Sequence, residues 1–107
     1  MSLYRNSKIM MTGHSLGGAL SVMGAAFLQN TYKNVECLYT LGQPRVGNDK
    51  FAAFMTEFIP NTFRIVNYGD QVPHIPQSIL GFKHSGYEVW YNVKVMVDYK
   101  ICPSESK

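Results

Sequence analysis

The sequence Gly-His-Ser-Leu-Gly at residues 13–17 constrains the fold of this chain more than any other feature. A short apolar run, residues 8–12, precedes it, and apolar residues at helical spacing follow it. In this arrangement the serine occupies a sharp turn between a strand and a helix, and small residues two positions before and after it leave room for the neighbouring backbone. Gly13 and Gly17 meet that requirement. The pattern therefore predicts a nucleophile elbow, with Ser15 as the nucleophile of a serine hydrolase.

The predicted helix after Ser15 combines large apolar residues with small ones. The small residues keep the helix slim, so we expect it to pack closely against a sheet. The large residues at helical spacing are Leu16, Leu20, Met23, Phe27 and Leu28, and the small ones are Gly18, Ala19, Gly24, Ala25 and Ala26.

Two further segments, residues 35–41 and 62–68, are rich in strand-forming residues and are each followed by glycine. A second helix is predicted between them, because Asn48 or Asp49 can cap its start and Pro60 ends it. The order strand, helix, strand, helix, strand predicts an α/β fold with a mostly parallel sheet, since each helix crosses over between parallel neighbours. The apolar positions of the second helix are Phe51, Phe54, Met55 and Phe58.

The pattern changes after Asp70. Residues 72–82 contain two prolines and a glycine and predict a loop, and residues 84–91 and 93–101 are strand-like runs on either side of Asn92. Two strands so close in sequence predict an antiparallel hairpin at the C-terminal edge of the sheet.

The composition is that of a folding segment, because 46% of the 107 residues are hydrophobic and 13% are aromatic, enough for one domain with a core. The ten Lys and Arg residues are dispersed, so the net charge of +3 predicts no nucleic-acid partner. No apolar run approaches the length of a transmembrane segment. Cys37 and Cys102 lie far apart, and we expect one buried and one exposed thiol rather than a disulfide.

A nucleophilic serine needs a histidine base, and that base is usually oriented by a carboxylate. Asp70 follows the third predicted strand as Ser15 follows the first, and these positions meet at the carboxyl edge of a parallel sheet. We therefore predict Asp70 as the acid of a triad, its alternative being an ordinary turn residue after Gly69. The backbone N–H of Leu16, at the start of the helix, is the predicted oxyanion donor. This chemistry requires no metal and no organic cofactor.

The histidine that would complete this triad is the difficulty. His14 adjoins Ser15 in the chain, but we expect its side chain to leave the turn in another direction and to pack or hydrogen-bond behind the elbow. His74 lies too near Asp70 in sequence to reach back to Ser15. His84 begins a strand and is expected to be structural, although it is the one alternative base inside the chain. We expect the true base to lie outside these 107 residues.

Four blocks of sequence, residues 12–19, 38–48, 67–76 and 82–91, resemble the class 3 lipases, the fungal-type triacylglycerol lipases, in order and spacing. The most specific stretch is Gly-Gln-Pro-Arg-Val-Gly at residues 42–47. The resemblance implies an α/β-hydrolase fold, with Ser15 as nucleophile, Asp70 as triad acid and an acylglycerol or another ester at a lipid interface as substrate. It also implies that His84 is not catalytic, because the base of the family comes from a later loop.

By the same resemblance, residues 1–107 correspond to the C-terminal portion of a lipase domain that is incomplete at both ends. The early strands, the lid and the loop with the second oxyanion donor would lie outside it. We therefore expect this chain alone to be inactive and to self-associate through the open edge of the strand at residues 8–12. The alternative is a non-catalytic remnant or interaction module that keeps only the core of the fold.

Overall fold

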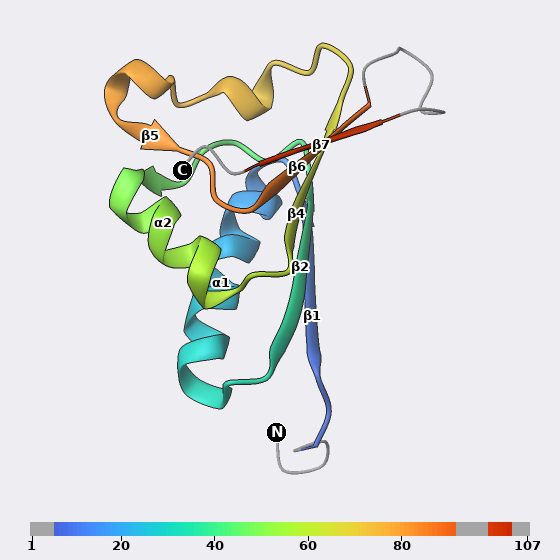
Figure 1. Ribbon diagram of the computed structural model, residues 1–107, viewed down its shortest axis with the longest axis vertical. Helices are drawn as coiled ribbons and strands as arrows, with labels where there is room; N and C mark the ends of the chain where they lie inside the picture. Colours follow the sequence, from blue (N-terminus) through green and yellow to red (C-terminus); the bar gives the residue numbers. More distant parts are fainter. Residues whose placement is uncertain (1–5, 92–98, 104–107) are drawn as a thin grey trace.

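The computed structural model describes residues 6–91 and 99–103 (Figure 1). Strands and helices alternate in the first two thirds of the chain, and short 3-10 helices replace the α-helices after the fourth strand. In chain order the elements are β1 (Ile9–His14), α1 (Leu16–Tyr32), β2 (Val35–Leu41), β3 (Gly47–Asn48), α2 (Asp49–Phe58), β4 (Thr62–Asn67), η1 (Val72–His74), η2 (Ser78–Leu80), β5 (Phe82–Lys83), β6 (Tyr87–Tyr91) and β7 (Lys100–Cys102).

Five strands form the main sheet in the order β1-β2-β4-β6-β7. The first four are parallel to their neighbours, and β7 runs antiparallel to β6 at the other edge. The predicted α/β fold with a mostly parallel sheet and a C-terminal antiparallel pair is confirmed. The register pairs His14 with Leu41 and Leu41 with Ile65, so the carboxyl ends of β1, β2 and β4 lie side by side.

Several strand boundaries differ from the predicted ones: β4 ends at Asn67 rather than at residue 68, and β6 begins at Tyr87 rather than at residue 84. Strand β1 continues to His14, two residues beyond the predicted end, because His14 still pairs with Leu41 and the next N–H, that of Ser15, donates to the Leu41 carbonyl at 2.9 Å. Of the second run of the predicted hairpin, only its end lies in the described strand β7, and residues 93–98 fall outside the described part of the chain. The two-stranded sheet β3-β5 was not predicted, because strands of two residues leave no periodicity to detect.

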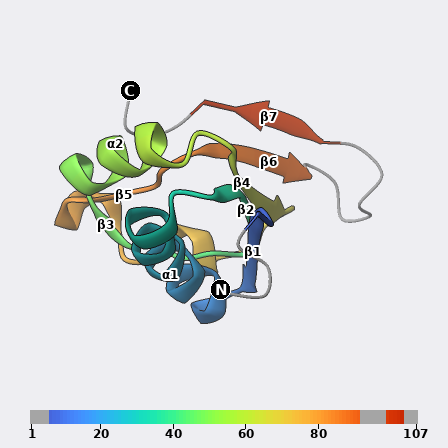
Figure 2. The ribbon, with the colours of Figure 1, turned by 90° about the horizontal axis from the view of Figure 1, so that it is seen from below.

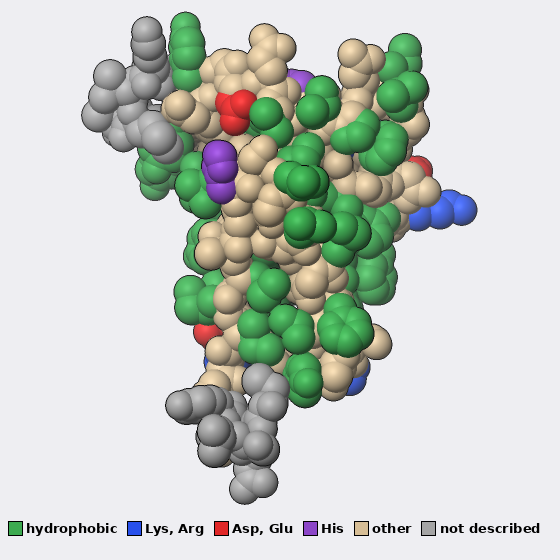
Figure 3. Space-filling model, turned by 180° about the vertical axis from the view of Figure 1, so that it is seen from behind, with side chains coloured by type: hydrophobic (Ala, Val, Ile, Leu, Met, Phe, Trp, Pro, Cys, Tyr) green, Lys and Arg blue, Asp and Glu red, His purple; other side chains and the backbone are tan. Residues whose placement is uncertain are grey.

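Both α-helices lie on the same side of the main sheet (Figure 2). Helix α1 contacts β1 and β2 through its small residues, and its buried positions are Gly18, Ala19, Ser21, Val22 and Ala25. Of the five large apolar residues that predicted this helix, only Leu28 packs against the core. The other four point away from it: Leu16, Leu20, Met23 and Phe27 are 68%, 55%, 49% and 68% exposed. From behind, hydrophobic side chains cover much of the molecule, with few charged ones among them (Figure 3).

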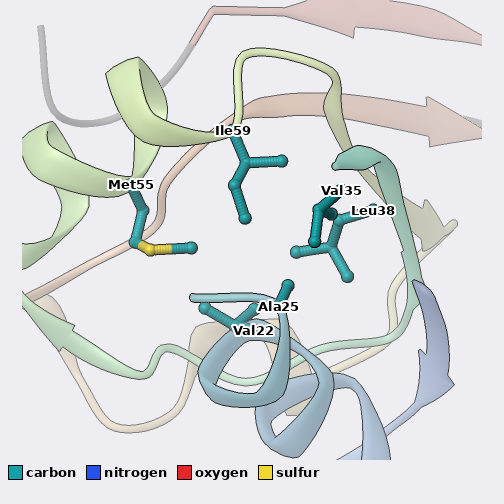
Figure 4. Packing of buried hydrophobic residues seen from close by; sticks show 6 residues of the cluster. All are labelled: Val22, Ala25, Val35, Leu38, Met55 and Ile59. Atoms are coloured by element: carbon teal, nitrogen blue, oxygen red, sulfur yellow. The ribbon is translucent and has the colours of Figure 1, made fainter. Parts of the chain in front are cut away.

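The hydrophobic core lies between the two helices and the sheet (Figure 4). It joins α1 to β2 and to the end of α2, so it fixes the helix that begins at Ser15 against the second strand. Its buried members are Val22, Ala25, Val35, Leu38, Met55 and Ile59. The predicted cap of α2 is confirmed, since the Asn48 side chain accepts a hydrogen bond from the Phe51 N–H at 2.9 Å.

Both cysteines are free thiols, as their spacing predicted. Cys37 is buried in β2, whereas Cys102 in β7 is half-buried. Burial and, to a smaller extent, the neighbouring Glu36 carboxylate raise the pKa of the Cys37 thiol. Cys37 therefore stays protonated at neutral pH and does not compete with Ser15 as a nucleophile.

Candidate functional site

Ser15 occupies a strained turn between β1 and α1. Its backbone angles are φ 55° and ψ −124°, a conformation that residues other than glycine rarely adopt. Serine is a favoured N-cap residue, yet this hydroxyl makes no capping hydrogen bond although it stands at the N-cap of α1. The turn instead holds Ser15 through its backbone: its N–H donates to Leu41, and its carbonyl accepts from the Gly18 N–H at 2.9 Å. The backbone thus fixes the residue without engaging its hydroxyl in the helix cap.

The close approach of α1 to β1 explains Gly13. A Cβ atom at Gly13 would overlap the Gly17 carbonyl and the Ser21 hydroxyl, so no larger residue fits without moving the helix. That hydroxyl is itself buried and lies 2.9 Å from the Thr12 carbonyl and 2.8 Å from the Gly17 carbonyl. The expectation that both positions require a small residue does not hold for Gly17, since a Cβ there would meet nothing within 4 Å in the described part of the chain.

Leu16 is the first residue of α1, a helix of 17 residues with no acidic side chain in its first turn. The first N–H groups of a helix have no partner inside it, and the helix dipole places partial positive charge at this end. The N–H of Leu16 directly follows the Ser15 turn, and a developing negative charge beside Ser15 would be stabilised there.

Asp70 follows β4, at the same carboxyl end of the parallel strands as Ser15. Strand β2 lies between β4 and β1. Its Oδ1 accepts a hydrogen bond from the Val72 N–H at 3.1 Å. Its Oδ2 lies against Gly42, where a Cβ would come within 2.7 Å of that oxygen. Gly42 has φ +62°, so its lack of a side chain serves both the turn after β2 and the placement of the carboxylate. Sequence reasoning missed this role, which depends on the contact between two loops distant in the chain.

A hollow of about 520 Å³ lies at this edge of the sheet, lined by His14, Leu41, Gly42, Ile65, Asn67, Tyr68, Gly69 and Asp70. The prediction that His14 packs behind the elbow is wrong. Side chains alternate along β1, and His14 falls on the exposed side with Met10 and Thr12. The structure therefore brings His14 and Asp70 to one hollow, with Ser15 immediately after His14.

The other two histidines lie in or beside the loop that follows Asp70. His74 ends η1 and is exposed. His84 is 2% exposed, and its Nε2–H donates to the Pro73 carbonyl at 2.6 Å. The buried ring is thus fixed against the loop after Asp70, which argues against His84 as the base for Ser15 and agrees with a structural role.

In residues 6–91 and 99–103, no three His, Cys, Asp or Glu side chains are grouped so that they could hold a metal ion. None of the helices in those same ranges is long and apolar enough to span a membrane.

Comparison with known proteins decides the family. Residues 1–79 match the family described as Lipase (class 3). The chain belongs to the class 3 lipases. It is 42% identical over 83 residues to the secreted mono- and diacylglycerol lipase 1 of Fusarium solani. This match covers 78% of the present chain and 25% of the Fusarium protein. It is 37% identical over 106 residues to a lipase of Rhizomucor miehei, covering 95% of this chain and 29% of that protein.

The fold of this class 3 lipase chain is also that of solved lipase structures. Lipase II from Rhizopus niveus matches with a TM-score of 0.88 and 34% sequence identity, over 97% of this chain and 40% of that structure. The chain thus spans less than a third of the length of the two relatives above and two fifths of the solved structure.

Proposed function

We propose that the full-length protein hydrolyses esters of acylglycerols through an acyl-enzyme on Ser15. The observation that carries this proposal is the strained Ser15 turn between β1 and α1, whose hydroxyl makes no capping hydrogen bond. Holding a serine in this conformation costs stability, and such strain is concentrated at functional sites. Membership in the class 3 lipases supports the same reaction type.

In the proposed mechanism, a histidine base takes the proton of Ser15 as its oxygen attacks the ester carbonyl. The Leu16 N–H stabilises the oxyanion of the tetrahedral intermediate. The protonated histidine then donates its proton to the leaving alcohol, and water hydrolyses the acyl-enzyme by the same steps. Asp70 orients the histidine and stabilises its charged form. We place this histidine outside the 107 residues, so the isolated chain should not turn over an ester.

An acylglycerol substrate is proposed from two arguments. The relatives are named as lipases, and one of them as a mono- and diacylglycerol lipase. The hollow that His14 and Asp70 line also contains the side chains of Leu41, Ile65 and Tyr68, which suit the hydrocarbon part of an ester better than a charged group.

Labelling with a phosphonate ester tests the assignment of the nucleophile. In the full-length protein we expect one adduct, on the tryptic peptide of residues 9–33, with fragmentation placing it on Ser15 rather than Ser21. Only a serine activated by a base should react at a useful rate. Labelling that persists in Ser15→Ala, or an adduct on another residue, would contradict the proposal.

We also propose that the isolated 107-residue chain self-associates. Strand β1 stands at an edge of the main sheet, so one row of its backbone groups is open to another strand. The exposed stripe Leu16, Leu20, Met23 and Phe27 lies on the neighbouring helix, and large exposed apolar patches promote association.

Sedimentation velocity combined with a urea titration measures this association. We expect oligomers and a shallow unfolding transition for the wild-type chain, and a shift toward monomer in Phe27→Lys. Asn30→Lys is the matched control, because it adds the same charge to an exposed polar position of the same helix and leaves the stripe intact. A monodisperse monomer with a sharp unfolding transition would show that the chain is a complete fold.

A further inference from the structure

The loop after Asp70 is held by its backbone carbonyls. Four successive carbonyls, those of residues 73–76, each accept a hydrogen bond from outside the loop. Two residues supply the donors. His84 Nε2–H donates to the Pro73 carbonyl at 2.6 Å. Arg45 Nη1 donates to the carbonyls of His74 at 2.8 Å and Pro76 at 3.2 Å, and the Arg45 backbone N–H donates to the Ile75 carbonyl at 2.7 Å. We call these four bonds the carbonyl clamp.

The carbonyl clamp is connected to the Asp70 carboxylate through η1. The His74 N–H donates to the Gln71 carbonyl at 3.0 Å and the Ile75 N–H donates to the Val72 carbonyl at 3.1 Å, which makes the segment one hydrogen-bonded unit. The Val72 N–H donates in turn to Asp70 Oδ1. A shift of the clamped segment therefore moves the donor that orients the carboxylate.

The opposite side of Asp70 is set by the same loop that supplies Arg45. Residues 42–45 follow β2, and Gly42 leaves the space that Asp70 Oδ2 occupies. Arg45 extends from this loop to the carbonyls of the second loop. Residues 42–45 therefore act on both oxygens of the Asp70 carboxylate. Gly42 leaves space for Oδ2, and Arg45 holds the segment whose Val72 N–H donates to Oδ1.

We propose that Arg45 and His84 are positioning residues that hold Asp70 in its catalytic orientation through the carbonyl clamp. This inference rests on the proposed function, since it assigns Asp70 to the triad. Arg45 suits the task because its planar guanidinium donates to two carbonyls with little loss of conformational freedom per bond. His84 suits it because a buried ring nitrogen is fixed in direction.

Kinetics of the full-length protein with a short-chain p-nitrophenyl ester test the clamp. Arg45→Ala should lower kcat about 10- to 100-fold and change KM less than about threefold, because a misplaced catalytic group affects the chemical step more than binding. Arg45→Lys keeps the positive charge and N–H donors but not the planar fork, and should recover part of kcat. Lys50→Ala is the matched control: it removes the same charge from an exposed position on α2 and should leave kcat unchanged.

Amide hydrogen exchange in the full-length protein gives a readout independent of activity. The Val72 N–H should exchange about tenfold faster in Arg45→Ala, while the amides of α1 keep their wild-type rates. Equal kcat in Arg45→Ala and Lys50→Ala, or unchanged exchange at Val72, overturns the proposal. If Arg45→Ala does not fold, Arg45→Gln takes its place under the same criteria. Activity that survives Ser15→Ala would instead refute the proposed function, and the exchange at Val72 still reports on the clamp.

Discussion

Replacing Ser15 by alanine in the full-length protein is expected to lower kcat for a short-chain ester about 10⁴-fold or more, with the fold retained. The loss is large because the acyl-enzyme cannot form without the hydroxyl, whereas the strained turn is held by backbone hydrogen bonds that alanine keeps. The measurement is the steady-state rate with a p-nitrophenyl ester, together with the melting temperature of the variant. Ser78→Ala, which removes an exposed hydroxyl from η2, is the control and should retain wild-type activity.

Asp70→Asn should lower kcat about 10³- to 10⁴-fold in the same assay, because an amide neither orients the histidine correctly nor stabilises its charge. The Asn side chain has nearly the same shape and can still accept from the Val72 N–H, so stability should change little. If Asp70→Asn kept more than about a tenth of the activity, Asp70 would be the turn residue that its place after Gly69 also allows.

Gly13→Ala is expected to have the largest effect on stability, a loss of about 3 kcal/mol in the free energy of unfolding. The added Cβ would overlap the Gly17 carbonyl and the Ser21 hydroxyl, and the backbone atom among them cannot rotate away. Helix α1 would have to move off β1. A urea titration followed by circular dichroism should show a lower midpoint or no cooperative transition in this variant.

Gly17→Ala is the matched control for Gly13→Ala. A Cβ at Gly17 meets no atom within 4 Å in the described part of the chain, and alanine has the higher helix propensity, so stability should change by about 1 kcal/mol or less. Similar losses from both substitutions would mean that the turn, rather than the packing of α1 on β1, sets the requirement for glycine.

The parts of the fold that the sequence predicted well are the local ones. The strand before Ser15, the two helices and the cap at Asn48 follow from periodicity and capping, which act over a few residues. Ser15, Leu16 and Asp70 could be placed at one edge because parallel strands end together. Their catalytic roles stay predictions until the serine is labelled and the carboxylate is replaced.

The parts that were missed depend on contacts between distant segments. The apolar periodicity of α1 is satisfied equally by either side facing the sheet, and only the volume available against β1 and β2 selects the small residues. The error at His14 has the same origin, because its direction follows from where β1 ends. The roles of Gly42 and Arg45 arise where two loops meet, and the sequence of either loop alone does not contain that information.

The Ser21 hydroxyl, close to the carbonyls of Thr12 and Gly17, joins the first turn of α1 to the last residues of β1. The first turn of an α-helix ordinarily frays, because its N–H groups lack partners within the helix. Here the Ser21 hydroxyl holds that turn against β1, so the Leu16 N–H should keep its direction before an ester binds. An N–H group that is already held in place needs no reordering when negative charge develops on the substrate oxygen. Thermal motion at the start of the helix would then change the direction of the Leu16 N–H little.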